Sequence, residues 1–139
     1  MRKQNGLAGM DVIIAIIVII IFSGLIISLM YNNVIQNVKL KKETLAMIYL
    51  TEISENIGIQ DYDHENYSLI GTEYTEIIEE NVFVPKKVID SYKVEMAVIT
   101  EFEGITDNED ILKKVQIKLT YKVGNKAYIC SMERIKIRE

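Results

Sequence analysis

The sequence has 139 residues, 49% of them hydrophobic and 26% charged, which allows one modest domain. The single Cys130 excludes an internal disulfide framework and zinc sites of the CxxC kind, and a single His excludes histidine-rich metal centres and most nucleophilic triads. From Lys39 onward there are 14 basic and 19 acidic residues, a balance of −5, so we expect protein or membrane partners and no nucleic-acid contact.

An uncharged, strongly apolar segment dominates the N-terminal part of the chain. No residue between Asp11 and Lys39 carries a formal charge, and residues 12–30 are almost entirely Ile, Val and Leu. As a helix, these residues span roughly 28 Å, which matches the hydrocarbon core of a bilayer. The remaining apolar sequence is too sparse to cover all sides of such a helix in a soluble protein. The segment therefore predicts a transmembrane helix, in which the small residues Ser23, Gly24 and Ser28 either admit neighbouring helices or face lipid.

Three interpretations of this N-terminal segment compete: a cleaved secretory signal, an uncleaved signal anchor, and a segment that is cut before its apolar stretch. The first is disfavoured, because the stretch is longer than that of a secretory signal and has no small-residue cleavage site after it. Arg2 and Lys3 favour a cytoplasmic N-terminus, although Lys39, Lys41 and Lys42 reduce the charge asymmetry. Since long domains translocate largely regardless of charge, we expect the C-terminal part outside the cytoplasm.

Asp11 stands at the beginning of the apolar helix. A carboxylate drawn unpaired into hydrocarbon is costly, so Asp11 is expected either to be paired or to lie at the cytoplasmic interface, where it complements the helix dipole. Five residues before it is Gly6, which follows the short basic leader Arg2-Lys3-Gln4-Asn5. This arrangement resembles the class III signal of type IV pilins and pseudopilins.

In that family a dedicated prepilin peptidase cuts after the glycine and methylates the new N-terminal amine. The resemblance therefore implies cleavage between Gly6 and Leu7, N-methylation of Leu7, and an assembly role for Asp11, whose carboxylate pairs with the amine of a neighbouring subunit. A buried pair of this kind sets register more than it adds stability. The chain has Leu7 where Phe is usual and Asp11 where Glu is usual, and it replaces a Thr-Leu-Ile-like run with Ala8-Gly9-Met10.

The helix is expected to continue beyond the membrane, because neither Pro nor Gly occurs between Met30 and Gly58. Gly58 is expected to end it as a C-terminal cap. One face carries an apolar stripe, which we expect to pack on the chain's own sheet because its repeat is too short for a partner-binding coiled coil. The stripe comprises Ala46, Leu50, Ile53 and Ile57.

The remaining sequence predicts a small antiparallel sheet. Residues 60–90 are acidic and tyrosine-rich and are expected to form a long connection with one or two short elements. Residues 92–98 and 115–123 alternate as half-buried strands, and Gly124-Asn125 predicts a tight hairpin turn. A two-residue turn pairs Leu119 with Cys130, Ile117 with Met132 and Tyr121 with Tyr128, all on one face. Because Ile135 and Ile137 fall on the opposite parity, a bulge or bend is expected near residues 132–134.

Two acidic clusters are weak candidates for metal binding. Asp61, Asp63, His64 and Glu65 lie close together, but such loops are more often solvated, and residues 107–110 lack the spacing of an EF-hand. Cys130 is expected to be a core residue of the hairpin. The sequence contains no Gly-rich phosphate loop, carboxylate pair or nucleophile-base arrangement. We therefore predict no metal, no cofactor and no enzymatic activity.

These observations predict an α+β fold in which a long N-terminal transmembrane helix continues into a small antiparallel β-sheet domain. The expected parts are a leader peptide at residues 1–6, a transmembrane helix with an assembly face at 7–30, its extracytoplasmic continuation at 31–58, and the sheet domain at 59–139. The whole pattern is similar to minor pilins of the PilV kind and to I-type minor pseudopilins of type II secretion. Abundant Ile, Lys and Asn suggest an AT-rich genome, and an exported domain without paired cysteines fits a Gram-positive anaerobe.

The resemblance implies a structural subunit, minor rather than major, of a type IV pilus-like or type II secretion-like filament. Its partners would be the prepilin peptidase, other pilin or pseudopilin subunits, the inner-membrane assembly platform and membrane lipid. It would be a single-pass membrane protein with a cytoplasmic N-terminus, able to enter an extracellular filament. The alternative is an unprocessed single-pass anchor that presents a small extracytoplasmic binding domain.

Overall fold

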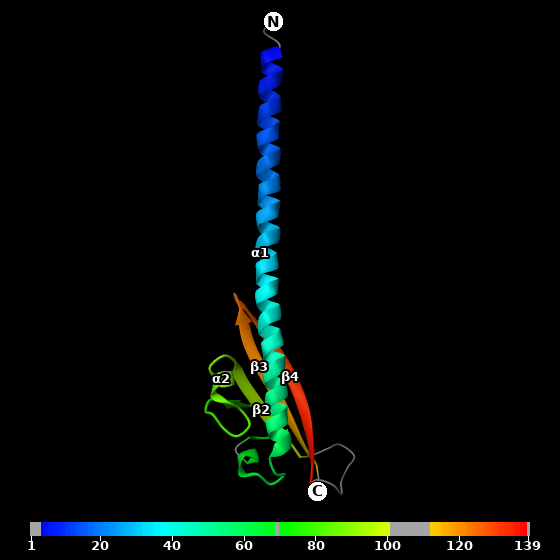
Figure 1. Ribbon diagram of the computed structural model, residues 1–139, viewed down its shortest axis with the longest axis vertical. Coiled ribbons are helices and arrows are strands. Elements are labelled where there is room, and N and C mark those ends of the chain that lie inside the picture. Colours follow the sequence, from blue (N-terminus) through cyan, green and yellow to red (C-terminus); the bar gives the residue numbers. More distant parts are fainter. Residues whose placement is uncertain (1–3, 69, 101–111, 139) are drawn as a thin grey trace. The chain divides into compact units, whose positions relative to one another are not determined.

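The computed structural model describes residues 4–68, 70–100 and 112–138 and divides into two compact units, residues 1–39 and 40–139. A long helix, α1 (Gln4–Ile59), comes first and belongs to both units. It is followed by a small antiparallel sheet, so the α+β layout is as predicted (Figure 1). The remaining elements are η1 (Glu65–Tyr67), β1 (Thr75–Ile77), α2 (Lys86–Ile89), β2 (Lys93–Ile99), β3 (Leu112–Val123) and β4 (Lys126–Ile137).

Helix α1 runs for 56 residues, which confirms that it continues past the apolar stretch. The expectation that Gly58 caps it was wrong, because the helix includes Gly58 and ends at Ile59, and Gly58 does not have the positive φ of a capping glycine. The lack of a side chain there has another reason. A Cβ on Gly58 would lie 2.9 Å from Nη2 of Arg134, so the glycine makes room for the guanidinium of a β4 residue.

The last turn of α1 is closed by a lysine from the far end of the chain. The ammonium of Lys136, on β4, donates hydrogen bonds to the carbonyl oxygens of Ile57 (3.2 Å), Gly58 (2.9 Å) and Gln60. The last carbonyls of a helix have no partner inside the helix, and a cation at this end also complements the helix dipole. Lys136 therefore joins the end of α1 to the last strand of the sheet.

Replacing Lys136 with Met should lower the free energy of unfolding of the sheet unit by about 1–2 kcal/mol, because partly buried helix carbonyls lose their donor. Denaturant unfolding of the full chain in detergent, followed by circular dichroism, measures this loss. Lys126→Met, an exposed change at the other end of β4, serves as the control and should cost under about 0.5 kcal/mol. Equal losses in the two variants would contradict the capping role.

Within the described residues the sheet has four strands in the order β1-β2-β3-β4, each antiparallel to its neighbours. The hairpin of β3 and β4 has the predicted register, with Leu119 opposite Cys130, and Gly124 begins its two-residue turn with a φ of +60°. Only glycine adopts this conformation at low cost. The predicted bulge near residues 132–134 was wrong, because the pairing continues without interruption from Val123↔Lys126 to Leu112↔Ile137.

Ile135 and Ile137 lie on the outward face of β4 for a reason that needs no bulge. Arg134 and Lys136 lie at the positions of β4 that face α1, where one lies over Gly58 and the other binds the helix carbonyls. Ile135 and Ile137 therefore lie on the opposite face of the sheet and are 58% and 59% exposed. Apolar residues point outward here because the inward positions are occupied by Lys136, which binds the helix end, and by Arg134, which lies over Gly58.

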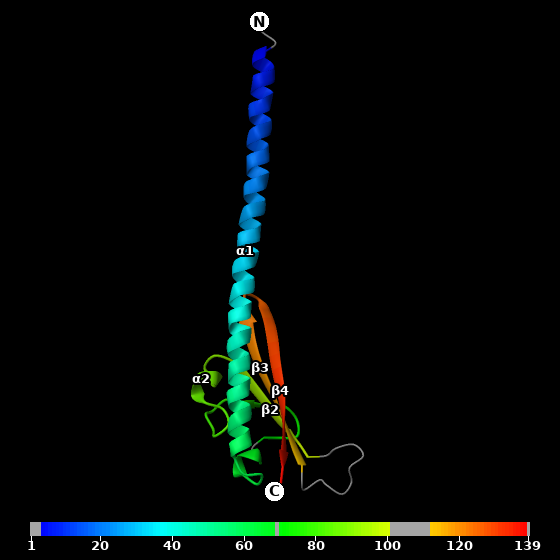
Figure 2. The same cartoon turned by 45° about the vertical axis from the view of Figure 1, so that its right-hand side comes forward.

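The core of the second unit lies between residues 40–59 of α1 and one face of the sheet. Both views show this part of the helix running along the sheet (Figures 1 and 2). The predicted apolar stripe of α1 is confirmed, since its four residues are completely buried. Cys130 lies opposite Leu119 as predicted, but it is only half-buried and packs against the edge of this core instead of lying within it. The other fully buried large side chains are Phe83, Val84, Val88, Val94, Met96, Val115, Ile117 and Leu119.

Buried tyrosines make this core sensitive to alkali. Burial raises the pKa of Tyr67 and Tyr92 and raises that of Tyr121 to about 12. An unfolded phenol titrates near pH 10, so the native state holds the Tyr121 proton more tightly than the unfolded state does. The resulting stability is present in full below about pH 10 and is lost as the pH rises toward 12. We expect the urea midpoint to fall across this range, and to fall less in Tyr121→Phe; an equal fall in both would contradict the assignment to Tyr121.

Candidate functional site in the N-terminal helix

The residues of the predicted processing signal lie in the first turns of α1. Gly6 and Leu7 are consecutive helical residues, and Asp11 follows Leu7 by four positions, which is one helical turn. Residues 1–3 of the expected leader lie outside the described residues, and Gln4 is the first residue of the helix. Residues four apart share a face of a helix, so Leu7 and Asp11 lie on one side of α1.

The carboxylate of Asp11 is exposed and has no hydrogen bond or ion pair with any residue that the structure describes. The residues that follow it along the helix offer none either, because the next charged residue in sequence is Lys39. A helix rises about 1.5 Å per residue, so this lysine is roughly 42 Å further along the helix. A positive partner for Asp11 must therefore come from outside the described part of this chain.

The apolar surface that follows Asp11 is fully open. All the large hydrophobic residues of the 12–30 segment have exposed fractions between 44% and 66%, and the most apolar window of α1 has a mean hydropathy of 3.3 with none of it buried. Within the described residues, α1 is the one helix long and apolar enough to cross a membrane. The rest of that helix differs sharply, because the stripe at residues 46–57 is covered by the chain's own sheet.

The small residues of this segment lie on an equally open surface. Gly24 and Ser28 are one turn apart and so share a face of the helix, and a Cβ added to Gly24 would meet no atom within 4 Å. The structure thus leaves room for a close neighbour at this position. Whether a helix or lipid takes that room stays a prediction.

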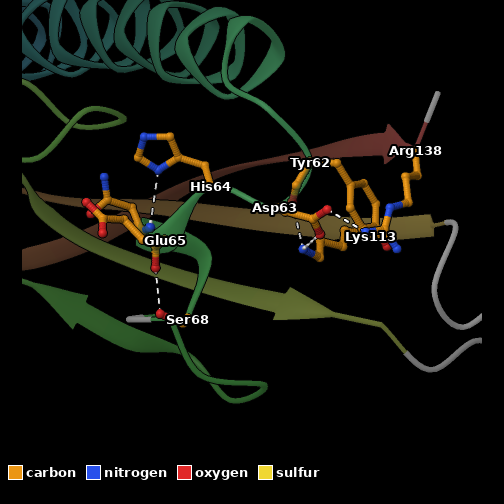
Figure 3. Close-up of polar contacts among 8 residues, drawn as sticks. Tyr62, Asp63, His64, Glu65, Ser68, Lys113 and Arg138 are labelled. Atoms are coloured by element: carbon orange, nitrogen blue, oxygen red, sulfur yellow. Dashed lines mark hydrogen bonds and ion pairs between the residues drawn. The ribbon is translucent and has the colours of Figure 1, made fainter.

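The acidic cluster at residues 61–65 does not converge on a metal position. Figure 3 shows Asp63 pointing toward Arg138 (2.5 Å between Nη2 and Oδ2) and toward Lys113 (4.0 Å between Nζ and Oδ1). His64 points the other way, and its Nδ1 accepts a hydrogen bond from the backbone of Asn66. Within the described ranges no group of three potential metal-binding side chains comes together. The second acidic cluster, at residues 107–110, lies outside the described residues.

Basic residues, which the sequence did not single out, organise this loop instead. Lys113 donates a hydrogen bond to the carbonyl of Tyr62 (2.7 Å), and its ammonium lies 4.0 Å from the centre of the Tyr62 ring. Arg138 lies over the same ring at 5.5 Å. The loop after α1 is thus held to β3 and to the end of β4, which is a structural role. The separation of about fifty or more residues between these partners left no local signal for it in the sequence.

Comparisons with protein-family models, with curated proteins and with solved structures find no match for this chain. Its functional interpretation therefore depends on its own residues. The relevant features are the Gly6-Leu7 junction, the unpaired Asp11 and the open apolar surface of α1.

Proposed function

We propose that this chain is a pilin-like structural subunit, with no catalytic role and no cofactor, which is cut after Gly6 and assembles through α1. It would be a minor component of a type IV pilus-like or type II secretion-like filament. The observation that carries the proposal is the position of Asp11: an exposed carboxylate without a partner in the described chain begins a helix whose next 27 residues are uncharged.

Processing would create the positively charged partner that Asp11 lacks within the described chain. Cleavage between Gly6 and Leu7 would create a secondary amine after methylation, and this cation would sit one helical turn from Asp11 in sequence. In an array of parallel helices, the amine of one subunit can pair with the carboxylate of the next. A charge left unpaired near the bilayer interior costs about 3 kcal/mol, so pairing favours subunits that are in register.

The apolar surface of α1 would serve in two environments. Before assembly, residues 12–30 hold the subunit in the bilayer, where their exposed side chains contact lipid. During assembly the same surface exchanges lipid for neighbouring helices. The partners in this scheme are the prepilin peptidase, other pilin or pseudopilin subunits, the inner-membrane assembly platform and membrane lipid. The N-terminus starts in the cytoplasm and the sheet unit lies outside the membrane.

The proposal predicts a specific covalent change. The intact mass of the protein recovered from membranes should show loss of residues 1–6 and gain of one methyl group, only when the cognate peptidase is present. Gly6→Leu should remain full length under both conditions, because the enzyme cuts after the glycine. A full-length mass of the natural chain with an active peptidase, verified on a known substrate in the same cells, would contradict processing and favour the unprocessed membrane anchor.

A further inference from the structure

Both edge strands of the sheet are open. Within the described residues, no backbone hydrogen bond outside the sheet's own ladder reaches β1 or β4. Strand β4 has 12 residues without a proline or a bulge, and its outward face exposes Ile129, Ile135 and Ile137. Proteins usually protect a long edge strand with a proline, a bulge or charged side chains, and β4 has only the charges. Such an edge resists pairing with a copy of like charge but stays able to pair with a strand of opposite charge.

The β1 edge is acidic. Of the four glutamates in residues 73–80, Glu76 shares Lys93 with Glu95, at 3.4 Å and 2.8 Å. The remaining three, Glu73, Glu79 and Glu80, are exposed and have no ion pair within the described chain. The exposed Ile78 lies between them.

The β4 edge is basic. Glu133 pairs with Lys114 (2.8 Å) and Arg138 pairs with Asp63, so these charges are compensated. Lys126 and Arg134 have no carboxylate partner in the described ranges, and Lys136 donates only to carbonyl oxygens. The β4 edge thus carries positive charges without carboxylate partners in the described ranges, and the β1 edge carries negative charges without ion-pair partners there.

We propose that the acidic β1 edge of one copy pairs with the basic β4 edge of a second copy, so that the two sheets join edge to edge into one continuous sheet. Neighbouring strands alternate in direction, so a second copy shifted sideways without rotation brings its β1 antiparallel to β4. Residues 40–59 of both copies are then parallel and lie on the same side of the extended sheet. This contact would be one of the subunit contacts of the proposed filament. It rests on the proposed function in one respect only: subunits held in the same membrane have parallel helices, as this contact requires.

The side chains select one register for this pairing. Thr75 and Ile77 face the same side as the buried Met96 and Val94, so they must lie opposite even-numbered residues of β4, which face that side too. The register that places Ile77 opposite Cys130 also places Thr75 opposite Met132. It brings Glu73, in the bend just before β1, toward Arg134, and Ile78, just after β1, toward Ile129. It brings no like charges opposite one another.

Neighbouring registers fit less well. A shift by two residues in one direction places Glu76 opposite Glu133, and a shift in the other direction moves Glu73 from Arg134 to Met132. A shift by one residue would turn the buried face of β1 outward. The proposed contact therefore makes a definite prediction about which residues of two copies meet.

Cys130 provides a direct test, because Ile77→Cys places a second thiol opposite it in the neighbouring copy. Within one copy, β2 and β3 separate the two positions by about 14 Å, which is too far for a disulfide. Oxidation of the full-length Ile77→Cys chain in membranes with active peptidase should therefore give a ladder of dimers and larger species on a non-reducing gel. Burial raises the pKa of the Cys130 thiol, so the reaction is run at mildly alkaline pH with copper phenanthroline.

Matched variants give the test its specificity. Ile77→Cys combined with Cys130→Ser should give no ladder, and Ile78→Cys, which faces the other side, should give at least tenfold less. Arg134→Glu in the Ile77→Cys chain should reduce the ladder at least tenfold, and adding Glu73→Arg should restore it. A folded Ile77→Cys chain without a ladder, or a ladder unchanged by Arg134→Glu, would overturn the contact.

The intact mass of the same samples separates this inference from the proposed function. Processed protein that forms no ladder would refute the edge contact and leave the filament subunit standing. Unprocessed protein that forms the ladder and responds to the charge reversal would support the edge contact and count against the pilin-like function.

Discussion

Replacing Asp11 with Ala is expected to abolish incorporation into filaments without preventing membrane insertion. Insertion depends on the apolar residues 12–30, which this change leaves intact. Assembly would bury the Leu7 amine without its counter-charge, and breaking a buried ion pair by removing one partner costs about 3–5 kcal/mol. At 1.4 kcal/mol per factor of ten, this corresponds to a loss of roughly 100-fold or more in incorporation. The ratio of protein in sheared filaments to protein in membranes measures the effect.

Two further variants of the same residue identify its cause. Asp11→Glu keeps the charge and should retain most of the incorporation, whereas Asp11→Asn keeps the size and should behave like Asp11→Ala. Processing after Gly6 should be normal in all three variants, as their intact masses would show. Natural levels of Asp11→Ala in filaments would refute the pairing argument, and a plain membrane anchor predicts no difference among the variants.

Leu50→Ala should have the largest effect on the stability of the sheet unit. Leu50 lies on the face of α1 that packs on the sheet and is completely buried. Removing a leucine side chain from a packed core costs about 2–5 kcal/mol through lost burial and the cavity left behind. Leu40→Ala is the matched control on the same helix, since Leu40 is 58% exposed. Its cost should stay within about 0.5 kcal/mol.

Denaturant unfolding of the full chain in detergent, followed by the near-ultraviolet dichroism of its tyrosines, gives both values. The apolar segment, residues 12–30, is identical in the two variants, so any difference between them reports on the packing of the second unit. Similar losses for Leu50→Ala and Leu40→Ala would mean that the stripe of α1 does not seat on the sheet.

The sequence predicted most of this unit because several of its signals are local. The alternation of residues 115–123 identified most of β3, and Gly124-Asn125 limited the turn to two residues. The turn determined the partners as far as Ile117 and Met132. The four-residue and three-residue spacing from Ala46 to Ile57 identified the buried face of α1.

The errors all involve contacts between distant residues. Gly58 was interpreted as a helix cap because the residue that requires its small size, Arg134, is 76 positions away in the sequence. Ile135 was interpreted as evidence for a bulge because the sequence did not show that the neighbouring cations of β4 face inward. Strand β1 has only three residues, too few for an alternation to be distinguished. Each feature depends on tertiary contacts that a short window of sequence does not contain.

Only part of the candidate site could be predicted from the sequence. The spacing of Gly6 and Asp11 and the length of the apolar stretch are local properties and identified the segment. The partner of Asp11 could not be identified in the same way, because the described part of the chain offers no positive charge to it. The assembly role that we propose for Asp11 requires another molecule, so experiments on several copies together are needed to test it.

Because Lys136 closes the end of α1, this part of the fold forms late during synthesis of the chain. The carbonyls of residues 57–60 emerge from the ribosome 76 to 79 residues before Lys136 does. At ordinary rates of synthesis this interval is roughly 4 to 16 seconds. The apolar segment is therefore synthesised well before the end of its own helix is closed, and the second unit completes its fold only after β4 has been made.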